Sequence, residues 1–187
     1  MKSTVDSSSG EQFTAAEKVE FNNEILASSR TASATLGDKM ISKANLELVR
    51  PVCENGGGDA AGGRIAVYQN YVGPDRCKNA AWCASFVSYI HNQATGNNGV
   101  RECYVPWLPK QGGSKPQMID NSHKPQKGDI VINRSNGHTG AYVKSKVINN
   151  VTKYYSIEGN HHGSDNPKVC VMQVKRNASY WGSYIRP

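Results

Sequence analysis

The spacing of apolar residues changes from helical to alternating between residues 95 and 125. Before this region, apolar residues recur every three or four positions, which predicts amphipathic helices. After it, apolar and polar residues alternate between turn-forming residues, which predicts antiparallel strands. We expect helices over 14–29, 33–49 and 64–72, and a fourth that begins at Cys83. We expect strands over 129–133, 139–144, 151–158, 169–175 and 180–185. Helices followed by an antiparallel meander predict an α+β fold.

A glycine-rich stretch divides the chain into two parts. The sequence NGGGDAAGG at 55–63 follows no expected strand and precedes no Gly-Lys-Ser/Thr, so we interpret it as a linker and not as a phosphate-binding loop. We therefore expect an N-terminal extension over residues 1–63, with a Ser-rich tail and two helices, and one domain over residues 64–187. A chain of 187 residues is long enough for one domain with a substantial core.

The segment NAAWCASFVSYIH, residues 79–91, places a cysteine at the head of an apolar helix. Trp82, Phe86 and Ile90 recur every four residues and predict a face that packs on the sheet. Cys83 would lie in the first turn, where unpaired N–H groups and the positive end of the helix dipole favour a thiolate. On this segment alone, an unreactive core cysteine is an equal alternative, because free cysteines are commonly buried.

The other cysteines are compatible with disulfides. The chain has five cysteines, an odd number, and none forms a CxxC pair that would indicate structural zinc. Setting Cys83 aside leaves four residues that allow three pairings in an oxidising compartment: Cys53, Cys77, Cys103 and Cys170. In a reducing cytoplasm they would remain thiols.

The charge of the chain favours a polyanionic partner. There are 22 Lys and Arg against 15 Asp and Glu, a formal net charge of +7, which suits nucleic acid, anionic lipid or acidic wall polymers. The basic residues are scattered, and no zinc-finger, RNP-like or basic-zipper pattern accompanies them, so we expect no nucleic-acid partner. No apolar run approaches the roughly 18 residues of a membrane span, so we expect no membrane insertion.

A histidine and two acceptors complete a candidate catalytic set. A cysteine nucleophile needs a base that takes its proton, and the base needs an acceptor that orients it. His138 opens an expected strand after a Ser-Asn-Gly turn, and Glu158 and Asn160 end the next strand in SIEGN. Neighbouring strands lie about 5 Å apart, so either acceptor can reach the second ring nitrogen of His138 and fix its tautomer.

Four segments together resemble the CHAP amidases, the cysteine, histidine-dependent amidohydrolases/peptidases related to NlpC/P60 and papain-like enzymes. They are AWCASFVSYI, KPQKGDIVI followed by GHTGAYV, SIEGN, and the closing YWGSYIRP. The resemblance covers roughly residues 64–187. It implies a papain-like fold, with helices packed on the antiparallel meander, and hydrolysis of amide bonds in the peptide part of peptidoglycan. It also implies Cys83 as nucleophile, His138 as general base and later acid, and Glu158 with Asn160 as orienting groups, with no metal or cofactor.

Residues close to the nucleophile are candidates for substrate contact. The backbone N–H of Cys83 is the natural donor to the oxyanion, and the side chain of Asn79 is a candidate second donor. We expect Trp82, next to the nucleophile, to contact substrate.

The irregular segment 99–124 is a candidate wall of the binding groove. It carries Trp107, which we expect to contact substrate, together with Tyr104 and Lys110. A covering surface without a binding role is the alternative for this segment.

A metal site is not expected at the remaining histidines. His161, His162 and Asp165 are close in sequence, but adjacent residues of an extended chain point to opposite sides.

The resemblance therefore implies a wall-degrading cysteine amidase or endopeptidase, acting as a phage lysin or as a toxin delivered into a rival cell. The alternative is a non-catalytic wall- or glycan-binding module on the same fold. A nucleic-acid binder is a third hypothesis, which only the charge supports. The expected partner is peptidoglycan; a toxin would also have an immunity or inhibitor protein and a delivery machinery. The first residues lack the apolar core of a secretory signal, so we expect synthesis in the cytoplasm and action at the wall or periplasm after export, lysis or injection.

Overall fold

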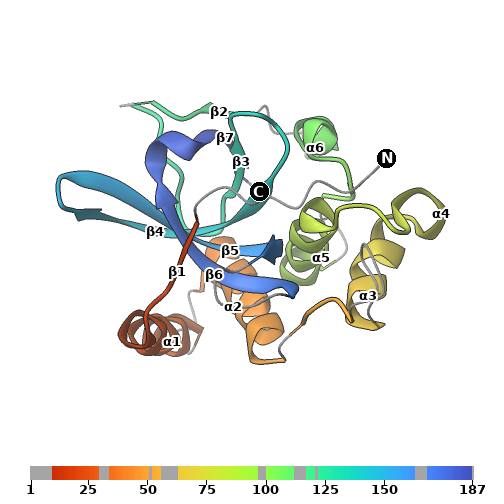
Figure 1. Cartoon of the computed structure of the whole chain (residues 1–187), viewed down its shortest axis with the longest axis horizontal. Helices are drawn as coiled ribbons and strands as arrows, with labels where there is room; N and C mark the ends of the chain where they lie inside the picture. The colour runs from red at the N-terminus through yellow and green to blue at the C-terminus, as the bar shows by residue number, and fades with distance from the viewer. Residues whose placement is uncertain are drawn as a thin grey trace.

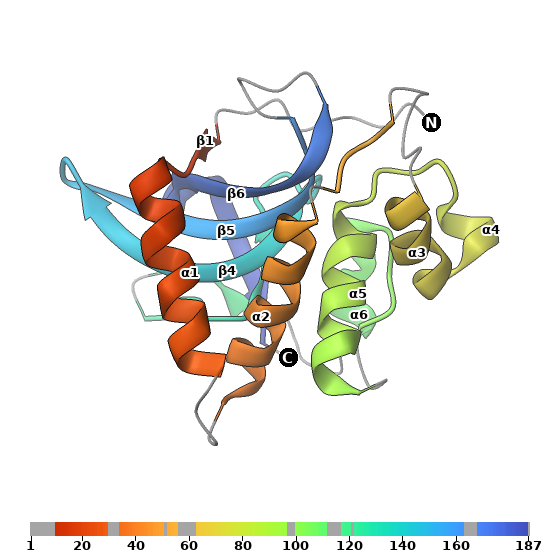
Figure 2. The ribbon, with the colours of Figure 1, turned by 90° about the horizontal axis from the view of Figure 1, so that it is seen from below.

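The computed structural model describes residues 10–29, 34–50, 52–55, 63–96, 100–111, 117–120, 122–162 and 168–186. These residues form an α+β fold around an open antiparallel sheet, as the sequence predicts (Figure 1). Seen from below, α1 and α2 lie in front of the long strands, with α5 beside them and α3 and α4 beyond α5 (Figure 2). In the described part of the chain, no helix is both long and apolar enough to cross a bilayer.

The sheet confirms all five expected strands and adds two short ones. Its seven strands, in the described residues, are β1 (Glu11–Gln12), β2 (Gln117–Met118), β3 (Ile130–Asn133), β4 (Thr139–Ile148), β5 (Val151–His162), β6 (Val169–Asn177) and β7 (Trp181–Ile185). The order across the sheet is β1-β6-β5-β4-β3-β7-β2, and every pair is antiparallel. Thus β3 to β6 form a meander, and β7 returns beside β3.

The strand β5 differs from the prediction in a way that concerns the candidate site. It continues to His162, so Glu158 and Asn160 lie inside the strand and not at its end. The register with β6 shifts between Glu158 and His161, and Asn160 has a left-handed backbone with φ of 57°. In a regular strand, the side chains of Glu158 and Asn160 would point to the same side, because the two residues are two positions apart. The irregularity between them removes this relation.

The expected helices are also present. They are α1 (Ala15–Ser29), α2 (Leu36–Val49), α3 (Gly63–Val72) and α5 (Cys83–Thr95), with two short unpredicted helices, α4 (Pro74–Cys77) and α6 (Leu108–Gln111). Reciprocal side-chain to backbone hydrogen bonds between Thr14 and Glu17 start α1, as expected. Thr35 and Asp38 start α2 in the same way, whereas the predicted start at Ser33 lies outside the described residues.

The helix α5, which begins at the candidate nucleophile Cys83, packs tightly on β5. The predicted face of Trp82, Phe86 and Ile90 is fully buried, and it belongs to the main core between helices and sheet. A Cβ atom added at Gly159 would lie 2.7 Å from the Cβ of Phe86 and 2.8 Å from the ring of Trp82. The absence of a side chain at Gly159 therefore lets the first turns of α5 lie directly against the part of β5 that carries Glu158.

The opposite face of the sheet carries a second, aromatic core. Its buried members are Val131, Tyr142, Tyr154, Trp181 and Tyr184. The two from β7 come from the closing segment YWGSYIRP, whose aromatic residues thereby hold β7 beside β3.

The N-terminal residues pack on the same body. The carboxylate of Glu47 in α2 is buried and accepts hydrogen bonds from Arg64 and from the Tyr68 hydroxyl, at 2.6 Å for the latter. Gly128 has φ of +89°, and a Cβ atom there would lie 2.2 Å from the Cα of Gly37. The described parts of 1–63 thus contact the remainder closely. The predicted boundary at residue 63 stays a prediction, because residues 56–62 of the linker lie outside the described chain.

Two disulfides select one of the three possible pairings. Cys53 pairs with Cys170 across 117 residues, and Cys77 pairs with Cys103 across 26 residues. Cys83 is the free cysteine among the described residues. The odd count therefore divides into two bridges and one thiol.

We predict that the bridges contribute strongly to stability. By the loop-entropy relation, loss of Cys77–Cys103 should lower the free energy of unfolding by about 3.5 kcal/mol, and loss of Cys53–Cys170 by about 5 kcal/mol. The measurement is urea unfolding of each paired Cys→Ser variant in a Cys83→Ala background, where no free thiol can exchange with a disulfide. A loss below about 1 kcal/mol for the longer bridge would contradict this estimate.

Candidate active site

The fold brings Cys83, His138 and Glu158 into contact from three elements. Cys83 is the first residue of α5, His138 directly precedes β4, and Glu158 lies in β5. The Nε2 atom of His138 is 2.8 Å from Oε2 of Glu158, and the Cys83 thiol is close enough to the same ring to raise the pKa of His138. Because Nε2 faces the carboxylate, Nδ1 is the nitrogen left for the thiol. The His138 ring therefore lies between the Cys83 thiol and the Glu158 carboxylate, in the order in which the three residues occur in the sequence.

The turn before β4 holds His138 in place. The side-chain Oδ1 of Asn133 accepts the N–H groups of Gly137 at 2.8 Å and His138 at 3.0 Å. The backbone N–H of Asn133 donates to the carbonyl of His138 at 3.0 Å. Asn136 takes the left-handed conformation that tight turns favour. These contacts direct the His138 ring inward, where the residue is 1% exposed.

A buried arginine completes the site, and we did not predict it. Arg176 of β6 places Nη2 2.8 Å and Nε 3.3 Å from Oε2 of Glu158, and its Nε 3.1 Å from Oε1. The Ser156 hydroxyl donates to Oε1 at 2.6 Å. Both charged side chains are almost fully buried. A sequence signal existed: Arg176 is two residues from the buried Val174, and the two side chains share one side of β6. An arginine on an apolar strand face requires a buried carboxylate partner.

The ionised form of Glu158 is strongly favoured. Burial alone would raise the pKa of Glu158, but the charge of Arg176 and the hydrogen bond with His138 hold it well below its usual range. The carboxylate is therefore a permanent acceptor for the His138 ring.

The same environment makes His138 a cation at neutral pH. Burial alone would lower the pKa of His138, but hydrogen bonds with Cys83 and Glu158, and the negative charge of Glu158, raise it to about 10. Both ring nitrogens then carry protons, so one can be donated to Glu158 and the other toward the sulfur.

We predict that His138 titrates near pH 10. The imidazole Hε1 resonance of the native protein should keep its protonated shift through neutral pH, and Glu158→Gln should lower the midpoint because a negative neighbour is lost. The folded pKa lies above the ordinary 6.5. The stability that this proton contributes is therefore complete below pH 6.5 and is lost as pH rises through about 10. A native midpoint between 6 and 7 would contradict the prediction.

Asn160 does not occupy its expected place. His138 bonds to Glu158 in this structure, and the buried Oδ1 of Asn160 has no hydrogen-bond partner within the described chain. The register shift in β5 explains the difference, because it gives Asn160 a left-handed backbone two residues beyond Glu158. Of the two acceptors that we considered, the carboxylate is the one that orients the histidine.

The predicted substrate contacts divide into buried and exposed residues. Trp82 is fully buried, and its indole N–H donates to Oε1 of Glu54 at 2.9 Å. Our expectation that it contacts substrate is therefore wrong for this structure, because core packing of the first turn of α5 covers the ring. Asn79 is exposed with a left-handed backbone, and Trp107 is 45% exposed.

A group with metal-ligating atoms is present but does not fit a metal. His138, Glu158 and His161 offer ligand atoms within 4.8 Å of one another. Nη2 of Arg176, however, lies 2.8 Å from Glu158 Oε2 and 3.2 Å from His161 Nδ1. The guanidinium cation occupies the position that a metal ion would need. Of the histidine pair considered earlier, His162 is exposed, and Asp165 lies outside the described residues.

The candidate nucleophile Cys83 is nearly covered. Cys83 is 2% exposed, so a substrate carbonyl reaches it only with local opening of the covering groups. A separate cavity of about 530 Å³ is lined by Tyr142 and Tyr154 of the second core, with Arg134 and Lys124, and does not include Cys83. Its size therefore does not bear on the thiol chemistry.

Comparison of the chain with protein-family models, curated proteins and solved structures gave no match. Functional conclusions therefore depend on the geometry of the site and on the motifs in the sequence.

Proposed function

We propose that this protein is a cysteine amidase or endopeptidase that cleaves amide bonds in the peptide part of peptidoglycan, on a papain-like fold. The contact of the Cys83 thiol with a His138 ring that the buried Glu158 carboxylate orients is the observation that carries the proposal. The CHAP-like motifs supply the substrate class, because those three residues lie in the segments that carry the resemblance.

In the proposed mechanism, the thiol proton is held on His138 and the Cys83 sulfur attacks the carbonyl carbon of the substrate amide. The carbonyl oxygen becomes an oxyanion, which accepts from the backbone N–H of Cys83, free of a helical partner in the first turn of α5. His138 then donates its proton to the departing amine, and the C–N bond breaks to leave a thioester. Water loses a proton to His138 and attacks the thioester, which releases the carboxylate and the thiol.

Two features support action at the wall after export, lysis or injection. Disulfides persist in oxidising compartments and are rare in the cytoplasm, and this chain has two. The net charge of +7 favours accumulation at an anionic wall. Peptidoglycan is the proposed partner, and a delivered toxin would also require an immunity protein in the producing cell.

The test is mass spectrometry of purified peptidoglycan after digestion. New amine and carboxylate ends at one amide position are expected, and the fragment masses identify the bond. Absence of fragments from several wall types, with sedimentation onto those walls retained, would overturn the proposal and favour the non-catalytic wall-binding module.

A further inference from the structure

Tyr104 and Trp107 form an exposed aromatic corner. Tyr104 is 55% exposed and Trp107 is 45% exposed. Their ring centroids are 5.6 Å apart, and their planes meet at 90°. Single exposed apolar residues are the normal case, whereas adjacent exposed rings are a candidate interaction site. We call these two residues the aromatic corner.

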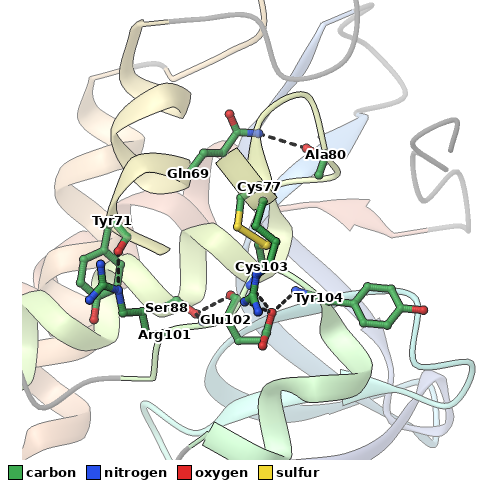
Figure 3. Close-up of a disulfide and its surroundings, with 10 residues drawn as sticks. Gln69, Tyr71, Cys77, Ala80, Ser88, Arg101, Glu102, Cys103 and Tyr104 are labelled. Carbon is green, nitrogen blue, oxygen red and sulfur yellow. Dashed lines mark hydrogen bonds and ion pairs between the residues drawn. A yellow bond between two sulfur atoms is a disulfide. The ribbon is translucent and has the colours of Figure 1, made fainter. Parts of the chain in front are cut away.

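The base of the aromatic corner is built to be rigid. The carboxylate of Glu102 is fully buried, and its Oε1 accepts the N–H groups of Cys103 at 2.8 Å and Tyr104 at 3.0 Å. The same oxygen accepts from Arg76 at 2.6 Å. The disulfide Cys77–Cys103 lies directly beside this carboxylate, and the ring of Tyr104 points away from it (Figure 3). A buried charge and a covalent bridge thus fix the backbone at the aromatic corner.

Two cations border the indole ring. The Cζ atom of Arg76 and the Nζ atom of Lys110 each lie 6.0 Å from the centroid of Trp107. The Arg76 side chain is 49% exposed although it binds Glu102, and Lys110 is exposed. A ligand of the aromatic corner should therefore combine an apolar face with a nearby negative charge.

The aromatic corner is anchored to the helix that begins with the proposed nucleophile. The hydroxyl of Ser88 in α5 donates to the carbonyl of Glu102 at 2.7 Å. Ser88 follows Cys83 by five residues, a rise of about 7.5 Å along the helix. Cys77 precedes Cys83 by six residues. The backbone beneath the aromatic corner is therefore held by the helix that begins at Cys83.

We propose that the aromatic corner is a subsite for the glycan strand of peptidoglycan. It rests on the proposed function. The apolar face of a pyranose ring packs on the Trp107 indole, its hydroxyl groups remain in water, and an acidic substituent on the sugar pairs with Lys110 and Arg76. Single-stranded nucleic acid fits less well, because successive bases stack on rings that follow the strand, whereas these two rings are perpendicular.

Tryptophan fluorescence isolates this site. Of the three tryptophans, Trp82 and Trp181 are fully buried, so an external ligand reports through Trp107. Inactive Cys83→Ala protein would be titrated with soluble peptide-free glycan strands that bear muramic acid carboxylates. A saturable fluorescence change is expected. A neutral chitin oligosaccharide should bind about tenfold more weakly, and free stem peptide and oligo-dT should give no change.

Variants decide whether the aromatic corner is responsible. Glycan binding by each variant would be measured by sedimentation with radiolabelled glycan. Trp107→Leu should weaken glycan binding at least tenfold, and Lys110→Gln should weaken it about threefold. Val147→Ser is the matched control, since Val147 is 70% exposed on another element, and its binding should be unchanged. Circular dichroism checks the fold of each variant. Unchanged glycan binding by Trp107→Leu, or a response to stem peptide or oligo-dT in place of glycan, would overturn the subsite.

The two proposals fail separately. If wall digestion by the native protein releases peptide fragments but glycan binding is absent, the subsite alone is wrong. If glycan binds at Trp107 but no bond is cut, the amidase proposal alone is wrong.

Discussion

Alanine in place of Cys83 is expected to abolish the release of peptide fragments from peptidoglycan. Removal of a covalent nucleophile costs on the order of 10⁴–10⁶-fold in turnover, because no thioester can form. The substitution removes one buried atom from a residue that is 2% exposed, so the destabilisation should be no more than about 1 kcal/mol. The measurement is the initial rate of fragment release, followed by mass spectrometry, with the unfolding midpoint in urea as the check on folding.

Companion variants make this prediction specific to a catalytic pair. His138→Ala should be impaired to a similar degree, and the double variant Cys83→Ala/His138→Ala should be no slower than either alone, because residues that act as one unit are not additive. Asn79→Ala tests the candidate second oxyanion donor and should lower the rate of fragment release less than Cys83→Ala does. Fragment release by Cys83→Ala at the native rate would exclude Cys83 as the nucleophile.

Local patterns were sufficient to predict most of the fold. The four-residue recurrence from Trp82 identifies α5, and the pattern after residue 125 identifies the five main strands, because the two spacings match the periods of a helix and of a strand. The strands β1 and β2 are two residues each, which is too short for any periodicity. The continuation of β5 to His162 depends on pairing with β6, and local sequence does not encode that partner.

The candidate site shows a similar division. Cys83, His138 and Glu158 were predictable because a thiol nucleophile requires a base and an acceptor of these residue types, and each lies in a recognisable local segment. The burial of Trp82 was not, since its Glu54 partner lies 28 residues earlier in the chain. The contribution of Arg176 was also missed: its place on an apolar strand face was a signal for a buried partner, but the identity of that partner, Glu158 on another strand, is shown only by the assembled sheet.

Replacement of Arg176 by methionine is expected to produce a large loss of stability. The side chain of Glu158 is fully buried, and removal of one partner of a buried ion pair leaves an uncompensated charge, which costs about 3–5 kcal/mol. The measurement is the free energy of unfolding in urea at pH 7. Methionine keeps much of the buried volume, so the loss reports on charge more than on a cavity.

Two further comparisons separate the charge from packing. The double variant Arg176→Met/Glu158→Gln removes both charges of this ion pair and should recover a large part of the stability lost in Arg176→Met, because Glu158 no longer carries an unpaired buried charge. The pH dependence gives the second check. In the native protein the depressed pKa of Glu158 contributes stability above the ordinary value of 4.5, and this is lost as pH falls. Without Arg176, burial raises the pKa of Glu158, and protonation then relieves the unpaired charge. The stability difference between Arg176→Met and the native protein should therefore narrow as pH falls from 7 toward 4. A constant difference across that range, with no recovery in the double variant, would assign the effect to packing and remove the electrostatic role of Arg176.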